Sequence, residues 1–107
     1  MNKLNSKNTQ DLYTAILALK NIGEAKRFFR DLLTEQEIVE FGNRWKAARM
    51  LDRDISYAVI SNETGLSSTT VARISRWLQK GMGGYRLMLK RLNFHHGKSD
   101  SFGKGLR

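Results

Sequence analysis

The chain has 107 residues, 40% of them hydrophobic and 27% charged, which is the composition of one small globular domain. It contains no cysteine, which excludes disulfide frameworks, iron–sulfur clusters, cysteine-ligated zinc and thiol nucleophiles. It also shows no apolar stretch long enough for a signal peptide or a membrane span. We therefore expect a cytoplasmic protein with no membrane partner.

The formal net charge of +9 is distributed unevenly along the chain. Residues 64–107 hold nine lysines and arginines against one acidic residue, whereas residues 1–63 hold ten against nine. Because net charge governs association rather than fold, this excess indicates a polyanionic partner. Nucleic acid, and double-stranded DNA in particular, is the partner we expect, ahead of an anionic membrane. The alternative is a solvated helix face followed by a charged tail.

Apolar residues recur at helical spacing through most of the chain, and no segment alternates like a strand. With no proline to interrupt a helix, the pattern predicts an all-α fold. Asn8 or Thr9 could cap a first helix that ends near residues 21–23, and a second helix follows over residues 25–33. The residues Thr34-Glu35-Gln36-Glu37 form a capping-box signature, which predicts a third helix ending near Asp52.

Shorter helices follow. Ser56 can cap a helix over residues 57–63, Gly65 suits a tight turn, and Ser67 can cap a helix over residues 68–80. A last helix is predicted over residues 85–93. We therefore divide the chain into a flexible N-terminus at residues 1–8, one helical dimerisation and DNA-binding domain at residues 9–93, and a disordered basic tail at residues 94–107.

The stretch from Tyr57 to Leu78 has the pattern of a helix-turn-helix unit. We expect its two helices to pack through four apolar side chains, Ile60, Leu66, Val71 and Ile74. The opposite face has no acidic residue and fits a major groove. We expect base-reading contacts from Ser68, Thr69, Ala72 and Arg73, and phosphate contacts from Ser67, Thr70, Arg76 and Lys80. The alternative is two packed helices whose polar face meets only water.

The segment from Leu32 to Arg73 resembles the Trp repressor family, in its Leu-Leu-Thr helix start, its Gly-x-Arg and its Gly-x-x-x-x-Thr-Val-x-Arg. The segment RFFRDLLTEQEI and the Gly84-Tyr85 ending are closer still to the Trp-repressor-related YerC/YecD-type branch. The resemblance covers most of residues 10–93. It implies an intertwined homodimer that presents two recognition helices to successive major grooves. One departure is Thr64, where a larger apolar residue is usual.

The resemblance also implies a ligand pocket, because four positions match those that surround the tryptophan co-repressor. These are Thr34, Arg44, Thr70 and Arg73. However, Ile74 and Trp77 stand where that family has small residues, so we expect the vestigial pocket to be filled by protein. We therefore expect DNA binding without tryptophan, no cofactor, and no small-molecule effector. Arg44 could equally be a solvated residue or contact a phosphate or a neighbouring helix.

We expect a sequence-specific transcriptional regulator that acts as a repressor. The alternatives are a helix-turn-helix module that binds a protein or RNA without operator specificity, and a DNA-binding part of a recombination system. An enzyme is not expected, because no nucleophile with a paired base and no carboxylate dyad is visible. His95 and His96 are adjacent without further ligands, so no metal site is expected. Trp45 and Trp77 lie at core spacings, and we expect both to pack inside.

Overall fold

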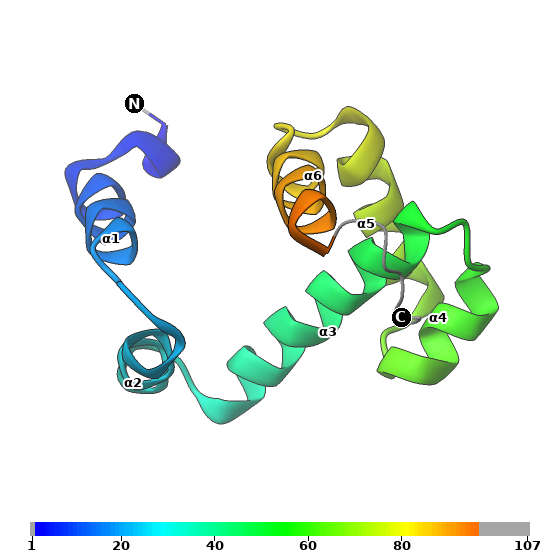
Figure 1. Ribbon diagram of the computed structural model, residues 1–107, viewed down its shortest axis with the longest axis horizontal. Helices are drawn as coiled ribbons and strands as arrows, with labels where there is room; N and C mark the ends of the chain where they lie inside the picture. Colours follow the sequence, from blue (N-terminus) through cyan, green and yellow to red (C-terminus); the bar gives the residue numbers. More distant parts are fainter. Residues whose placement is uncertain (1, 97–107) are drawn as a thin grey trace. The chain divides into compact units, whose positions relative to one another are not determined.

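The computed structural model describes the backbone of residues 2–96 and the side chains of residues 2–93. Within these residues it contains helices and no strand, which confirms the all-α prediction. Figure 1 shows the elements in chain order, from a short 3-10 helix to α6. They are η1 (Lys3–Asn5), α1 (Lys7–Leu17), α2 (Ile22–Leu32), α3 (Glu35–Asp52), α4 (Tyr57–Thr64), α5 (Ser68–Lys80) and α6 (Gly84–His96). None of these described helices is both long and apolar enough to cross a membrane.

The contacts divide the chain into two units, with the boundary between Val39 and Glu40. The first unit holds η1, α1, α2 and the start of α3, and the second holds the rest of α3 with α4, α5 and α6. The single domain expected over residues 9–93 therefore stays a prediction.

The first unit begins earlier than the sequence pattern indicated. Residues 3–5 already form a helical turn, and Ser6, not Asn8 or Thr9, caps α1 by accepting a hydrogen bond from the Thr9 backbone N–H at 3.2 Å. The first helix also ends at Leu17, before the predicted residues 21–23. The reason is Asn21, whose side chain accepts from the Glu24 N–H at 2.9 Å and so starts α2 instead of ending α1.

The start and end of α3 agree with the prediction. The Thr34 hydroxyl accepts a hydrogen bond from the Glu37 backbone N–H at 3.1 Å, and the Glu37 carboxylate accepts one from the Thr34 N–H at 2.9 Å. This reciprocal pair is the expected capping box, and it satisfies two backbone donors that the helix start would otherwise leave free. After Asp52 the chain turns through Asp54, which has a positive φ of 62°.

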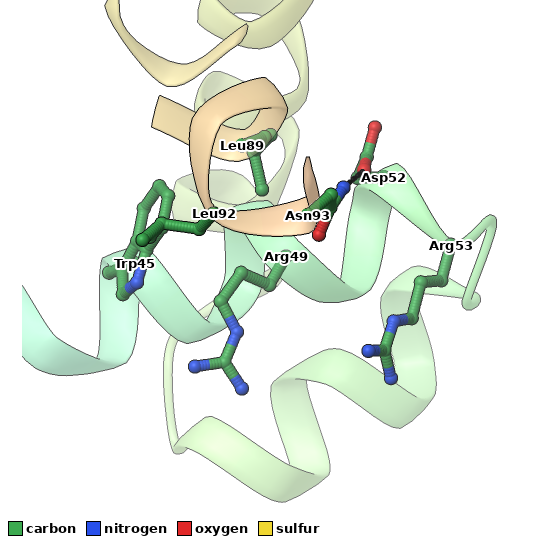
Figure 2. Close-up of a pocket in the computed structure, with 7 residues that line it drawn as sticks. All are labelled: Trp45, Arg49, Asp52, Arg53, Leu89, Leu92 and Asn93. Carbon is green, nitrogen blue, oxygen red and sulfur yellow. Dashed lines mark hydrogen bonds between the residues drawn. The ribbon is translucent and has the colours of Figure 1, made fainter. Parts of the chain in front are cut away.

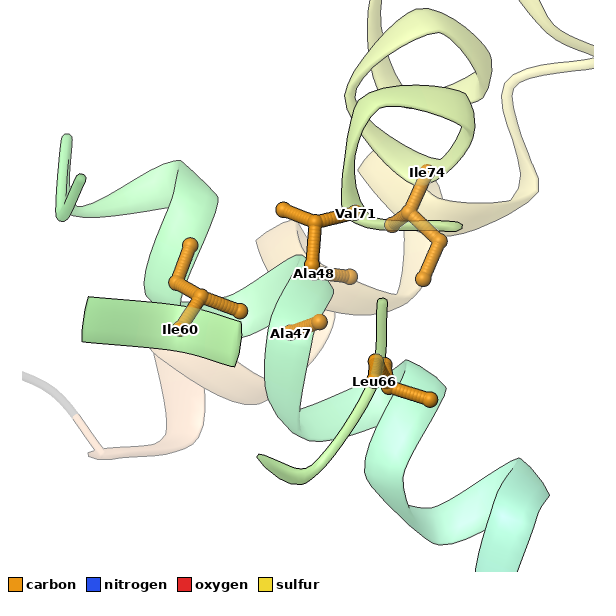
Figure 3. Packing of buried hydrophobic residues seen from close by; sticks show 6 residues of the cluster. All are labelled: Ala47, Ala48, Ile60, Leu66, Val71 and Ile74. Atoms are coloured by element: carbon orange, nitrogen blue, oxygen red, sulfur yellow. The ribbon is translucent and has the colours of Figure 1, made fainter. Parts of the chain in front are cut away.

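A small hydrophobic core holds the second unit together. Ala47 and Ala48 of α3 meet Ile60 of α4, and the remaining members come from the turn and from α5: Leu66, Val71 and Ile74. Figure 3 shows the two alanines lying between the larger side chains. Since alanine has no side chain beyond Cβ, the other helices can approach the α3 backbone closely. This confirms the predicted packing of the four apolar residues of the helix-turn-helix unit.

The last helix is longer than predicted, because α6 extends to His96 instead of ending near Asn93. The first three positions of the tail expected at residues 94–107 are therefore helical. The side chains of His95 and His96 and the rest of that tail lie outside the described residues.

Candidate nucleic-acid interface

The turn between α4 and α5 depends on Gly65. Its φ of +77° is left-handed, and its backbone N–H donates to the Ser61 carbonyl at 2.8 Å, which closes α4. A glycine adopts this conformation without the steric cost that a side chain incurs. The turn therefore redirects the chain from α4 into α5 within three residues, Gly65 to Ser67, as a helix-turn-helix unit requires.

Thr64 stands where the family resemblance leads us to expect a larger apolar residue. Its side chain is buried in this turn, and its hydroxyl makes two hydrogen bonds. Its hydroxyl donates to the Ile60 carbonyl at 2.7 Å and accepts from the Leu66 backbone N–H at 3.2 Å. The hydroxyl thus satisfies a backbone donor that the turn would otherwise bury without a partner. A threonine is therefore compatible with the fold of the unit.

The N-terminal end of α5 is capped and free of acidic residues. Ser67 Oγ accepts a hydrogen bond from the Thr70 backbone N–H at 3.1 Å, and its oxygen also lies 3.1 Å from Thr70 Oγ1. The first turn holds no aspartate or glutamate. The positive end of the helix dipole and exposed hydroxyl groups therefore face solvent together, an arrangement that can accept a phosphate.

The two sides of α5 differ sharply. Its buried side is formed by Val71, Ile74, Ser75 and Leu78. The opposite side is exposed and bears the predicted base-reading and phosphate-binding residues: Ser67, Ser68, Thr69, Ala72, Arg73, Arg76 and Lys80. Thr70 is half-buried at the edge. The residues assigned to DNA contact are thus accessible on one helix, and their roles stay a prediction.

A groove of about 270 Å³ runs beside this face, between the start of α4 and the second half of α5. Arg76 and Lys80 line it together with two residues that the sequence analysis did not single out, Tyr57 and Gln79. Tyr57 is the first residue of α4, directly after the capping Ser56, and is exposed. The sequence did contain a signal for Tyr57, because the residue lies at a predicted helix N-terminus, and such ends favour the binding of anions.

The four residues of the vestigial pocket have separate roles in the structure. Thr34 caps α3 within the first unit, and Arg44 is ion-paired with Glu40 one turn earlier at 3.1 Å. Thr70 lies at the N-terminal end of α5, and Arg73 is exposed. Arg44 thus has the intrahelical partner typical of a solvated helix residue. The proposed pocket itself stays a prediction.

The two residues expected to fill that pocket differ in burial. Ile74 has no exposed surface and belongs to the core, whereas Trp77 is 43% exposed. Trp77 lines an open apolar groove with Trp45, Met82, Tyr85 and Met88, so its expected packing inside the core is not seen in the described chain. Trp45 is half-buried and stacks on Tyr85, with ring centroids 6.3 Å apart.

Comparison with known proteins identifies the family. Residues 7–93 match the family model described as Trp repressor protein. The uncharacterised protein YerC of Bacillus subtilis (strain 168) is 38% identical over 101 residues, which cover 94% of this chain and 97% of that protein. A TrpR-like protein from Eubacterium eligens is 36% identical with a TM-score of 0.83, covering 94% of this chain and all of the other. A candidate Trp repressor from Staphylococcus aureus is 38% identical with a TM-score of 0.80, covering 85% of this chain and 91% of the other. This chain therefore belongs to the Trp repressor family.

Proposed function

We propose that this protein is a sequence-specific DNA-binding transcriptional regulator that acts as a repressor. The observation that supports this most strongly is the exposed, acid-free side of α5, on a helix whose other side is fixed to the core by Val71 and Ile74. Its N-terminal end offers short polar side chains to base edges, and Arg73 can donate two hydrogen bonds to a guanine. Membership of the Trp repressor family supports the same assignment.

Phosphate contacts surround the base readers in this proposal. Ser67 and Thr70 act at the start of α5, and Arg76 and Lys80 act further along it. Tyr57 shares a groove with Arg76 and Lys80, so its exposed hydroxyl can donate to the same stretch of backbone. These contacts fix the register of α5 on the duplex but do not read its sequence.

The active species in this proposal is a homodimer. No side chain between residues 2 and 39 is buried, although large apolar residues such as Leu17 and Ile22 lie there with 85% and 76% of their surface exposed. Apolar surface of this extent favours a partner, and a second copy of the chain supplies a matching surface. The operator is then an approximate palindrome with half-sites about one helical turn, or ~34–36 Å, apart.

Tryptophan has no place in the proposed mechanism. Ile74 stands where the family resemblance implies a small residue beside the tryptophan. Its side chain has no exposed surface, so it occupies the space that the indole ring would need. We expect isothermal titration calorimetry with L-tryptophan to show no saturable heat. Binding at micromolar concentration would contradict this part of the proposal and leave the DNA-binding part standing.

In vitro selection from a random duplex library tests the function directly. We expect a palindromic consensus, and an affinity for it at least ~10³-fold above that for a shuffled duplex. The logarithm of the affinity should fall linearly with the logarithm of salt concentration, by ~0.9 for each phosphate contacted. Selection without a consensus, together with equal affinity for every duplex, would instead favour the module that binds RNA or protein.

A further inference from the structure

The exposed side of α5 bears one small apolar side chain among polar ones, that of Ala72. Ser68 lies one turn before Ala72 and Arg76 one turn after it, so the three residues share one stripe of the helix. The other exposed apolar residue of α5, Trp77, lines a different groove. Ala72 takes no part in the core cluster that holds the helix-turn-helix unit together. Its methyl group is therefore available to a ligand.

Ala72 also lines the groove of about 270 Å³ that holds Arg76 and Lys80. Tyr57, at the start of α4, lines the same groove with its exposed ring. A methyl group and an aromatic ring thus lie beside the two cations that we assign to phosphates. A nucleotide whose apolar group lies close to its own phosphate would match this combination.

The side chains at the N-terminal end of the exposed side are short. Ser68, Thr69 and Ala72 follow one another along two turns, and none of them extends further than two atoms beyond Cα. A helix with short side chains can approach the floor of a major groove closely. The Cβ atom of Ala72 can then come within about 4 Å of a base edge, which is the distance of a van der Waals contact.

Thymine is the base that offers Ala72 an apolar partner. In the major groove the purines present polar atoms, whereas thymine adds a C5-methyl group, and cytosine has a hydrogen at that position. A methyl group forms no hydrogen bond, so packing it on a polar base edge would displace water without compensation. The C5 position also lies on the edge of the base nearest its own sugar–phosphate backbone. This position agrees with the two cations beside Ala72 in the groove.

We propose that Ala72 reads the C5-methyl group of one thymine in each half-site, while Arg76 and Lys80 bind phosphates of the same strand. The inference rests on the proposed DNA-binding function and deepens it, because it names the chemical group that one residue of α5 recognises. The recognised group is a 5-methylpyrimidine. The operator therefore contains one thymine per half-site that Ala72 distinguishes from uracil.

The selected operator provides the test, with the unaltered full chain. Each thymine position of the half-site is replaced in turn by deoxyuridine, which removes the C5-methyl group and leaves every hydrogen-bonding atom in place. We expect one position at which deoxyuridine raises the Kd about fourfold per half-site, the effect of burying one methyl group. At that position 5-methylcytosine should also bind about fourfold more tightly than cytosine. Fluorescence anisotropy measures all these affinities.

Variants assign the effect to Ala72. Ala72→Gly removes the methyl group, and we expect it to bind the thymine and uracil operators with equal affinity. Glycine also weakens a helix, so Ala58→Gly at an exposed position of α4 is the matched control, and it should keep the fourfold preference of about one methyl group. Thr69→Ser removes the other methyl group of this side and keeps the hydroxyl, and it should keep the preference as well. Circular dichroism checks that each variant folds.

The outcomes that overturn the inference differ from those that overturn the proposed function. If no thymine position responded to deoxyuridine, Ala72 would not read a methyl group, although a selected consensus would still support DNA recognition. A preference that survives in Ala72→Gly would show that Ala72 serves the helix alone, and a preference lost in Thr69→Ser instead would make Thr69 the reader. Selection without any consensus would overturn the proposed function together with this inference.

Discussion

Lys46 Nζ of α3 lies 3.4 Å from Glu63 Oε1 of α4, so an ion pair joins the core helix to the first helix of the helix-turn-helix unit. Both side chains are nearly half-exposed, at 43% and 49%. Water and salt therefore screen the pair, and its contribution to stability is small. We expect Glu63→Gln to lower the free energy of unfolding by no more than ~0.5 kcal/mol. Urea denaturation at low and at about 0.5 M salt measures this, and the difference should vanish at the higher salt.

The buried hydroxyl of Thr64 should matter more than that surface pair. Thr64→Val keeps the shape of the side chain but leaves the Leu66 N–H without its acceptor, which should cost ~1–3 kcal/mol. Thr14→Val is the matched control, because Thr14 makes the same kind of bond to the Gln10 carbonyl at 3.0 Å on an exposed surface. We expect the control to lose less than ~0.5 kcal/mol in the same denaturation experiment. Equal losses would show that burial of the Thr64 hydroxyl is not the cause.

Two glycines allow a test of backbone conformation with no change in packing. A Cβ at Gly65 or at Gly42 would meet nothing within 4 Å, but only Gly65 has a positive φ. We expect Gly65→Ala to destabilise the protein by ~1–2 kcal/mol, because alanine disfavours the left-handed conformation. Gly42→Ala, in the interior of α3, should stabilise it by ~0.5–1 kcal/mol. Opposite signs in urea denaturation support this reasoning, and a loss of stability in both would contradict it.

The starts of α3, α4 and α5 were predictable from sequence, whereas the caps of α1 and α2, Ser6 and Asn21, were missed. Ser56, Ser67 and the Thr34–Glu37 pair each bind a backbone N–H within three residues, so their effect is visible in a short segment. Asn21 acts in the same local way, but the apolar spacing before it suggested a longer first helix. The boundary between α1 and α2 was therefore predicted about four residues too late.

Burial was less predictable than helix position. Helical spacing correctly placed Ile60 and Ile74 in the core, but it also suggested that Trp77 would be covered, and Trp77 is 43% exposed. Periodicity shows which residues share one face of a helix and does not show what packs on that face. The sequence also contained no sign of a pocket between α3 and α6 that both Arg49 and Leu89 line (Figure 2), because these two residues are 40 positions apart in the chain.

The phenol of Tyr85 should make stability fall at alkaline pH. Burial raises the pKa of Tyr85 above its ordinary value, and nearby Arg44 opposes the shift. In the unfolded chain the Tyr85 phenol titrates at about pH 10, whereas in the folded protein its pKa is higher. Its contribution to stability is therefore fully present below about pH 10 and is lost as the pH rises through the folded-state pKa. Tyr85→Phe retains a ring to stack on Trp45 and removes this titration, so the decline above about pH 10 should be shallower. Urea midpoints from pH 8 to 11 measure it, with Tyr13→Phe on α1 as the control. An unchanged slope in Tyr85→Phe would contradict the assignment.

Arg73 and Arg76 lie one turn apart on the exposed side of α5, yet their substitutions should have different effects on DNA binding. Arg73 is nearer the end that reaches base edges, so Arg73→Ala should cost ~1–3 kcal/mol on the selected operator and relax preference at one base position. Arg76 lines the groove with Tyr57 and Lys80, and Arg76→Ala should weaken binding to selected and shuffled duplexes alike. Both variants should lower the net charge equally, so a difference between them reflects position rather than charge. Fluorescence anisotropy on the two duplexes at one salt concentration makes the comparison. If Arg73→Ala lost the same affinity on both duplexes, Arg73 would be a phosphate contact, and base reading would fall to Ser68 and Thr69.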